Sequence, residues 1–97
     1  MPVRITWDTP KDRLNRTKHK LGLEFAWNVL DDPMVVIVYD RFESGEDRYH
    51  AIGMVGWKCL LLVYTYPDPD DESWIQAISL REATSVERKR YEEGEFN

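Results

Sequence analysis

The sequence predicts an α+β fold with two N-terminal helices, an antiparallel sheet of three to five strands and a C-terminal helix. Two helical patterns precede residue 33, strand-like runs separated by short turns lie between residues 35 and 80, and a helix-capping signal follows near residue 84. Such an order is typical of helices packed on one face of an antiparallel sheet. The 97-residue length predicts a single domain over residues 1–97.

The N-terminal third predicts one short strand and two helices. Residues 3–7 alternate as in a strand, and Thr9-Pro10 is typical of an N-cap followed by proline at the first helical position. We expect Gly22 to end or bend this helix. The next apolar residues have the i, i+3, i+4, i+7 spacing of a core-facing helix that Asp31-Asp32-Pro33 breaks; they are Leu23, Ala26, Trp27 and Leu30.

The rest of the chain predicts a meander and a closing helix. Residues 35–42, 48–54 and 58–66 are rich in β-branched and aromatic side chains, and short turns connect them. After an acidic loop, residues 74–80 predict another strand and residues 81–92 a helix. Its start is open, because Ser79-x-x-Glu82 and Thr84-x-x-Glu87 both fit a capping box.

Basic side chains gather in two stretches of an acidic chain. Residues 11–20 hold five bases against one acid, a charge of +4, and residues 81–91 hold four against two, a charge of +2. Since the whole chain carries −5, the remainder carries −11. A basic patch surrounded by acid limits where a polyanion can bind, so we expect the two stretches to form one pocket for a phosphodiester.

Several classes of protein are excluded by composition. The single cysteine, Cys59, lies in an apolar run, which favours a buried thiol and a reducing cytoplasm. That run is far shorter than the ~20 residues of a membrane helix, and the N-terminus lacks the apolar core of a signal peptide. His19, His50 and Cys59 have no metal-site spacing and no phosphate loop is present, so we expect neither metal nor cofactor.

The first basic stretch offers a proton-transfer group. Lys18 and Lys20 favour a neutral His19 imidazole, which can act as a general base. The simpler alternative is a surface histidine favoured by the helix dipole. His50 lies within a predicted strand, and the sequence shows no partner for it.

The second stretch offers a phosphate-binding surface. If the last helix begins near Arg81, then Arg81, Thr84, Arg88 and Tyr91 share one face. Arginine binds two phosphate oxygens at once, and tyrosine can stack on a base or transfer a proton. The alternative is a solvated helix face on which Tyr91 packs by its ring. Arg48, after Glu46-Asp47, either balances those acids or projects over the sheet.

A set of short motifs occurs in order along nearly the whole chain. The N-terminal motifs are Trp7-Asp8, Lys11, Asn15, Lys18-His19, Leu23-Glu24-x-Ala26 and Asp32-Pro33. The later ones are Glu46-x-Arg48, Gly53, Leu61-Leu-Val-Tyr-Thr65 and Ile78-Ser79-x-Arg81-x-Ala83-Thr84-x-x-Glu87-Arg88-x-x-Tyr91. In this order they resemble the BrnT family of toxins, ribonucleases of bacterial type II toxin–antitoxin pairs. Two departures are Lys20, where the family usually has glycine, and Trp74-Ile75-Gln76, which lacks an arginine commonly found there.

The resemblance implies a RelE-like fold, RNA cleavage that stops translation, and a hetero-oligomer with a small ribbon-helix-helix antitoxin. Metal-independent cleavage by the ribose 2′-hydroxyl needs a base, an acid and cations beside the phosphate. On this hypothesis the base is His19 or Glu87, and Tyr91 stacks or donates a proton. The phosphate clamps are Arg48, Arg81 and Arg88, and the substrate-positioning charges are Lys11 and Lys18.

Two other functions are compatible with the same residues. The main alternative is a non-catalytic module that grips an acidic, antitoxin-like partner with its basic stretches. A free-standing DNA-binding regulator is the third, but the charge of −5 and the lack of a recognition-helix motif count against it.

Overall fold

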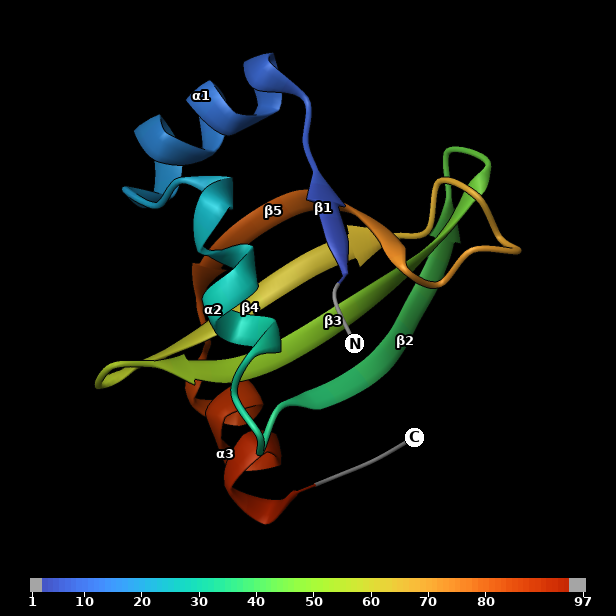
Figure 1. The fold of residues 1–97 in the computed structure, drawn as a ribbon. Helices are drawn as coiled ribbons and strands as arrows, with labels where there is room; N and C mark the ends of the chain where they lie inside the picture. The colour runs from blue at the N-terminus through green and yellow to red at the C-terminus, as the bar shows by residue number, and fades with distance from the viewer. Residues whose placement is uncertain (1–2, 95–97) are drawn as a thin grey trace.

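The fold is built on a five-stranded mixed sheet, seen in a computed structural model that describes residues 3–94 (Figure 1). Its strands stand in the order β1-β5-β4-β3-β2. Their bounds are Arg4–Thr6 (β1), Val36–Glu43 (β2), Glu46–Val55 (β3), Lys58–Thr65 (β4) and Trp74–Glu82 (β5). The predicted meander is confirmed by the antiparallel pairing of β2 to β5. The prediction of a wholly antiparallel sheet is wrong, because β1 pairs parallel to β5.

The first helix, α1, spans Thr9–His19, which confirms a helix in the first basic stretch. Both of its predicted ends are wrong. The N-cap is Asp8 rather than Thr9, since the Asp8 carboxylate accepts the Lys11 backbone N–H at 3.3 Å. The helix ends before Gly22 because Lys20 adopts a left-handed conformation, with φ of 61°.

Asn15 joins α1 to the sheet. Its side-chain amide donates to the Leu21 carbonyl at 2.7 Å and to the Leu80 carbonyl at 2.8 Å, and it accepts the Leu80 N–H at 3.0 Å. Asn15 is 5% exposed, so these bonds satisfy polar groups that water does not reach. These hydrogen bonds determine which face of α1 packs against β5.

The second predicted helix is two elements rather than one. A 3₁₀ turn, η1, spans Leu23–Phe25 and leads into a short α-helix, α2, over Ala26–Leu30. The buried side chains of Leu23, Ala26 and Val29 confirm the predicted core-facing stripe. Gly53 of β3 lets α2 approach closely, because a Cβ there would lie 2.7 Å from the Val29 carbonyl oxygen.

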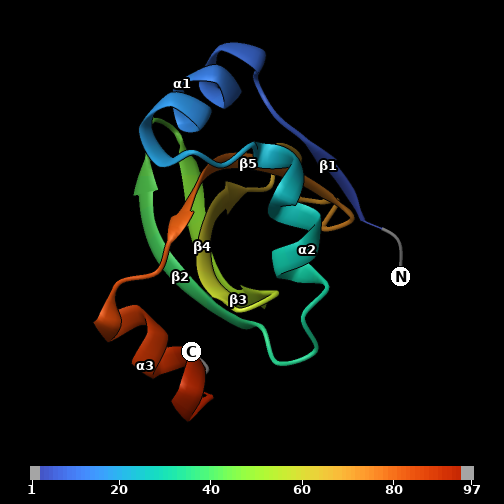
Figure 2. The same ribbon diagram turned by 90° about the vertical axis from the view of Figure 1, so that its left-hand side faces the viewer.

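The last helix, α3, spans Ser85–Glu93 and lies across the sheet from α2 (Figure 2). The sheet curves around α2 on its inner side. On its outer side Tyr91 of α3 packs against Ile52, Cys59 and Leu61. The prediction that the helices cover one face is therefore wrong. Strand β4 is buried on both faces, because its alternate side chains contribute to both clusters.

The residues at the start of α3 show which of the two predicted capping boxes forms. The Thr84 hydroxyl accepts the Glu87 backbone N–H at 3.2 Å, while the Glu87 carboxylate accepts the Thr84 N–H at 2.9 Å. Arg81 consequently lies in β5 and not in the helix. The prediction that Arg81, Thr84, Arg88 and Tyr91 form one helix face is wrong.

Among residues 3–94, no helix is both long enough and apolar enough to cross a bilayer.

Candidate functional site

The outer face of the sheet is uncovered between α1 and α3, which lie at its two ends (Figures 1 and 2). Directly paired residues of a sheet point to the same side. His50 of β3 pairs with Val63 of β4, and Val63 pairs with Ser79 of β5, so these three form a row across this face. Arg48 lies two residues before His50 and points to the same side. The outer face therefore carries polar side chains where the inner face carries the core.

A hollow of about 320 Å³ lies where α1 meets this face. Lys11, Lys18 and His19 line it because they recur at i, i+7 and i+8 on α1, and Arg48 and Ser79 complete it from the sheet. Neither Lys11 nor Lys18 forms an ion pair with any residue of the range 3–94. The structure thus brings together four of the predicted site residues and leaves their lysines available to an anion.

Arg48 is the most constrained cation of this hollow. Its side chain is 15% exposed, and its guanidinium makes only long contacts, 3.3 Å to Glu43 and 3.5 Å to Glu46. Its Nε is buried without a hydrogen-bond partner among the described residues. An unsatisfied buried donor costs about 1–3 kcal/mol, which an anionic ligand recovers. Arg48 therefore contacts the hairpin acids and also lines the hollow over the sheet, so the two predicted placements of this arginine occur together.

A second hollow, of about 240 Å³, follows toward α3. Its polar lining comes from β2, β3 and α3, through Asp40, His50, Thr84, Glu87 and Arg90. The two hollows are separate, but both reach β3, where Arg48 lines one and His50, two residues later, lines the other.

His50 has a partner that sequence reasoning missed. Its Nε2 lies 3.4 Å from the Asp40 carboxylate, and both side chains are 22% exposed. Asp40 reaches this face because it lies two residues after Val38, which pairs with His50, and a β-bulge between Tyr39 and Arg41 leaves Asp40 without a partner residue in β3. The hairpin signal Ser44-Gly45 places residues 40 and 50 near each other. The register of β2 with β3, together with alternation along β2, decides that they face the same side.

Arg81 and Glu87 form a bidentate ion pair, with N–O distances of 2.8 and 2.9 Å. The guanidinium of Arg81, together with the Thr84 N–H, lowers the pKa of Glu87 to about 2 despite its partial burial. A carboxylate held this strongly as an anion is a weak proton acceptor near neutral pH. This geometry favours a structural role for Glu87 over the predicted role as base.

The remaining predicted residues of α3 are engaged elsewhere. Arg88 pairs with Glu92 at 3.2 Å, one helical turn away, and is half exposed. The Tyr91 hydroxyl donates to Asp32 at 2.6 Å, and this bond, with burial, raises the pKa of Tyr91 to about 12. Neither hollow is lined by Arg81, Arg88 or Tyr91. The prediction that both basic stretches form one pocket is therefore not met by these hollows.

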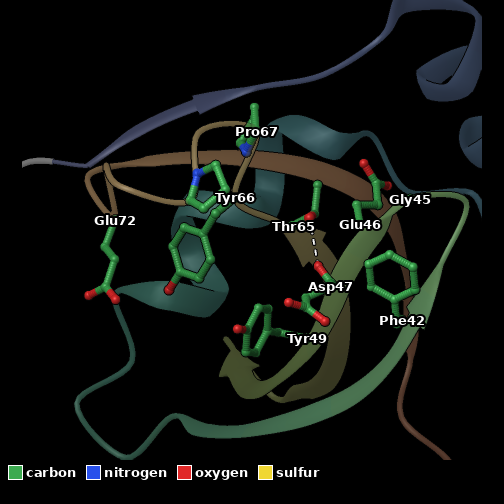
Figure 3. A pocket seen from close by; sticks show the side chains of 10 residues that line it. Phe42, Gly45, Glu46, Asp47, Tyr49, Thr65, Tyr66, Pro67 and Glu72 are labelled. Carbon is green, nitrogen blue, oxygen red and sulfur yellow. Dashed lines mark hydrogen bonds between the residues drawn. The ribbon is translucent and has the colours of Figure 1, made fainter.

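A third hollow, of about 440 Å³ and larger than the other two, differs from them in its charge (Figure 3). It lies between the β2–β3 hairpin and the loop after β4, where Tyr49 and Tyr66 pack edge to face at 5.3 Å. Its charged lining consists of Glu46, Asp47 and Glu72, without a lysine or arginine. Three carboxylates repel a phosphodiester, so this hollow is unsuited to a polyanion.

Two further expectations concern cysteine and metal. Cys59 is buried, and burial raises the pKa of its thiol, which confirms the predicted buried thiol. Within residues 3–94, no group of three or more His, Cys, Asp and Glu side chains is arranged to hold a metal ion.

Comparison with known families now bears on this surface. A family model described as the ribonuclease toxin BrnT of type II toxin–antitoxin systems matches residues 7–87. The chain belongs to this family. The BrnT match covers most of the chain and confirms the predicted resemblance. A search of curated proteins finds no match.

BrnT membership assigns the coarse activity. Proteins of this family are ribonuclease toxins of type II pairs, so the chain has an RNA target and an antitoxin partner. The matched region includes both hollows up to Glu87 and stops before Arg88 and Tyr91.

Proposed function

We propose that this BrnT toxin is an endoribonuclease that binds RNA across the outer face of its sheet and cleaves it by attack of the ribose 2′-hydroxyl on the adjacent phosphate, without a metal ion. The observation that carries the proposal is the hollow lined by Lys11, Lys18, His19 and Arg48. It gathers three cationic side chains and an imidazole around a space open to solvent. Cations and a proton-transfer group are what this reaction requires.

Phosphate binding is assigned to Arg48, Lys11 and Lys18. The buried Nε of Arg48 gives that residue a donor to satisfy, and the guanidinium geometry suits two phosphate oxygens. The two lysines add charge from α1 and need break no ion pair to do so. Arg81 and Arg88 are less suited to bind phosphate, because each is already in an ion pair. Arg81 must first break its pair with Glu87, and Arg88 its pair with Glu92.

Proton removal is assigned to His19. It lies in the same hollow as Arg48, so a phosphate at the arginine brings the neighbouring 2′-hydroxyl toward the imidazole. The developing negative charge on the phosphorane is stabilised by the surrounding cations.

The physiological setting completes the proposal. We infer that the cleaved RNA is translated RNA in the cytoplasm, so that cleavage stops protein synthesis, and that a small ribbon-helix-helix antitoxin inhibits the toxin in a hetero-oligomer. The fold is proposed to be RelE-like. Family membership supports the antitoxin partner and the RNA target in general.

The test is expression of the isolated chain, with growth and primer extension on cellular RNA as readouts. Arg48→Ala, Lys18→Ala and His19→Ala are compared with Lys89→Ala, a matched cation on α3 that lines neither hollow. Arg48→Ala is expected to weaken RNA binding about tenfold to a hundredfold, the cost of one or two charge-assisted hydrogen bonds. Lys18→Ala is expected to reduce the slope of the logarithm of the binding constant against the logarithm of salt concentration by about one, the value for one lost phosphate contact.

The outcomes separate an enzyme from an interaction module. Growth arrest with defined cleavage sites, lost in His19→Ala and kept in Lys89→Ala, supports the enzyme. Tight antitoxin binding without RNA cleavage by the wild-type chain refutes it and favours the non-catalytic module.

A further inference from the structure

Both histidines of the chain lie near Arg48, His19 at the end of α1 and His50 on the outer face of the sheet. His19 shares the first hollow with Arg48, and His50 follows Arg48 by two residues on β3. Residues i and i+2 of a strand stand about 6.6 Å apart on the same face. Arg48 thus has one histidine of α1 and one of the sheet as neighbours.

Asp40 gives His50 a fixed environment that His19 lacks. The carboxylate lies 3.4 Å from His50 Nε2, whereas the His19 ring makes no hydrogen bond or ion pair with residues 3–94. A carboxylate beside an imidazole can orient the ring. Two other charged groups line the second hollow, in which His50 lies. They are Glu87, which forms an ion pair with Arg81, and Arg90. Asp40 is therefore the carboxylate nearest to His50, and the same carboxylate oxygen also pairs with Arg41 at 3.3 Å.

We propose that His50, oriented by Asp40, is the general acid of the cleavage reaction, with His19 as the general base. This inference rests on the proposed ribonuclease function. His19 takes the proton of the 2′-hydroxyl as the bond between the 2′-oxygen and phosphorus forms. The bond between phosphorus and the 5′-oxygen breaks, and the 5′-oxygen keeps the electron pair and receives the proton of His50. The products are a 2′,3′-cyclic phosphate and a free 5′-hydroxyl.

The assignment of acid and base follows from the two environments. His19 lies among cations, in the hollow that Lys11 and Lys18 line. His50 lies beside the carboxylate of Asp40, in the second hollow. Opposite surroundings of two like groups are a common basis for division of labour between acid and base.

A pair of substrates tests the general acid directly. One is an RNA oligonucleotide with a single mapped cleavage site, and the other carries sulfur in place of the 5′-bridging oxygen at that site. A thiolate leaves without a proton, so a missing general acid slows cleavage of the oxygen substrate only. His50→Ala is expected to cleave the oxygen substrate about 10²–10⁴-fold more slowly than the wild type and the sulfur substrate within a few-fold of it. His19→Ala is expected to be slow on both.

Two further variants control for structure. Asp40→Asn is expected to slow the oxygen substrate less than His50→Ala does, again with recovery on the sulfur substrate. Asp70→Asn, an exposed carboxylate in the loop after β4, is the matched control and is expected to cleave both substrates at the wild-type rate. His50→Gln retains the polar side chain, and thermal unfolding of each variant shows whether the fold is kept.

The possible failures are distinguishable. Full activity of a folded His50→Ala or His50→Gln variant on the oxygen substrate overturns the general acid and leaves the ribonuclease proposal intact. An equal loss on both substrates also overturns it, since the residue then acts on a step other than leaving-group protonation. A wild-type protein that cleaves neither substrate overturns both proposals.

Discussion

Replacing Glu87 by glutamine tests the view that this carboxylate holds β5 and α3 together. Glu87 accepts two hydrogen bonds from Arg81 and one from the Thr84 N–H. Its pKa falls from an ordinary 4.5 to about 2 in the folded protein, and this gap corresponds to about 3 kcal/mol. Because the Glu87 and Arg81 side chains are 19% and 31% exposed, solvent screening reduces the expected loss to about 1–2 kcal/mol.

The pH dependence of that loss has a definite sign. Above about pH 4.5 the carboxylate is ionised in both states, so the full stabilisation is present. As the pH falls below this value, the unfolded chain binds a proton while folded Glu87 remains charged, so stability is lost progressively. The loss is complete near pH 2, where the folded carboxylate also becomes protonated.

The assay is urea unfolding of the wild type and of Glu87→Gln between pH 7 and pH 2. The difference in unfolding free energy is expected to be constant above pH 5 and to shrink toward pH 2. Comparing the two proteins cancels the contribution of the other carboxylates. Glu93→Gln, at the last position of the same helix, is the matched control and is expected to be neutral. Wild-type stability of Glu87→Gln at pH 7, or a difference that does not change with pH, refutes the reasoning.

Three further substitutions test other parts of the fold by urea unfolding. Asn15→Ala removes three buried hydrogen bonds and is expected to cost about 2–4 kcal/mol; a loss below 1 kcal/mol contradicts its bridging role. Tyr91→Phe removes the hydroxyl bonded to Asp32 and is expected to cost about 1.5 kcal/mol, with faster hydrogen exchange in α3 as a second readout; unchanged exchange argues against this anchor. Lys20→Gly relieves the left-handed backbone and is expected to stabilise by about 0.5–1 kcal/mol, whereas destabilisation shows that the lysine side chain matters more than its φ angle.

Local chemistry made much of this fold predictable. The β-branched runs identified β2 to β5, because strand preference and alternation depend only on residues close together in the sequence. The helical period of Lys11, Lys18 and His19 likewise placed these side chains together on α1. Where two local signals competed, as with the capping boxes at Ser79 and Thr84, the sequence left the choice open, and the position of Arg81 depended on it.

Other features depend on contacts between distant segments. The bond between Tyr91 and Asp32 spans 59 residues and holds α3 on the outer side of the sheet, which no local pattern indicated. The parallel pairing of β1 with β5 similarly joins the two ends of the chain.

The division between sequence and structure is clearest at the proposed site. By itself the sequence determined the residue types available, the basic face of α1, the strands and the resemblance to BrnT toxins. Only the tertiary structure decided that Arg48 joins that face, that Arg81 is engaged by Glu87, and that Asp40 meets His50. Propensity and periodicity act over a few residues, whereas these pairings depend on sheet register and on the side of the sheet on which α3 packs.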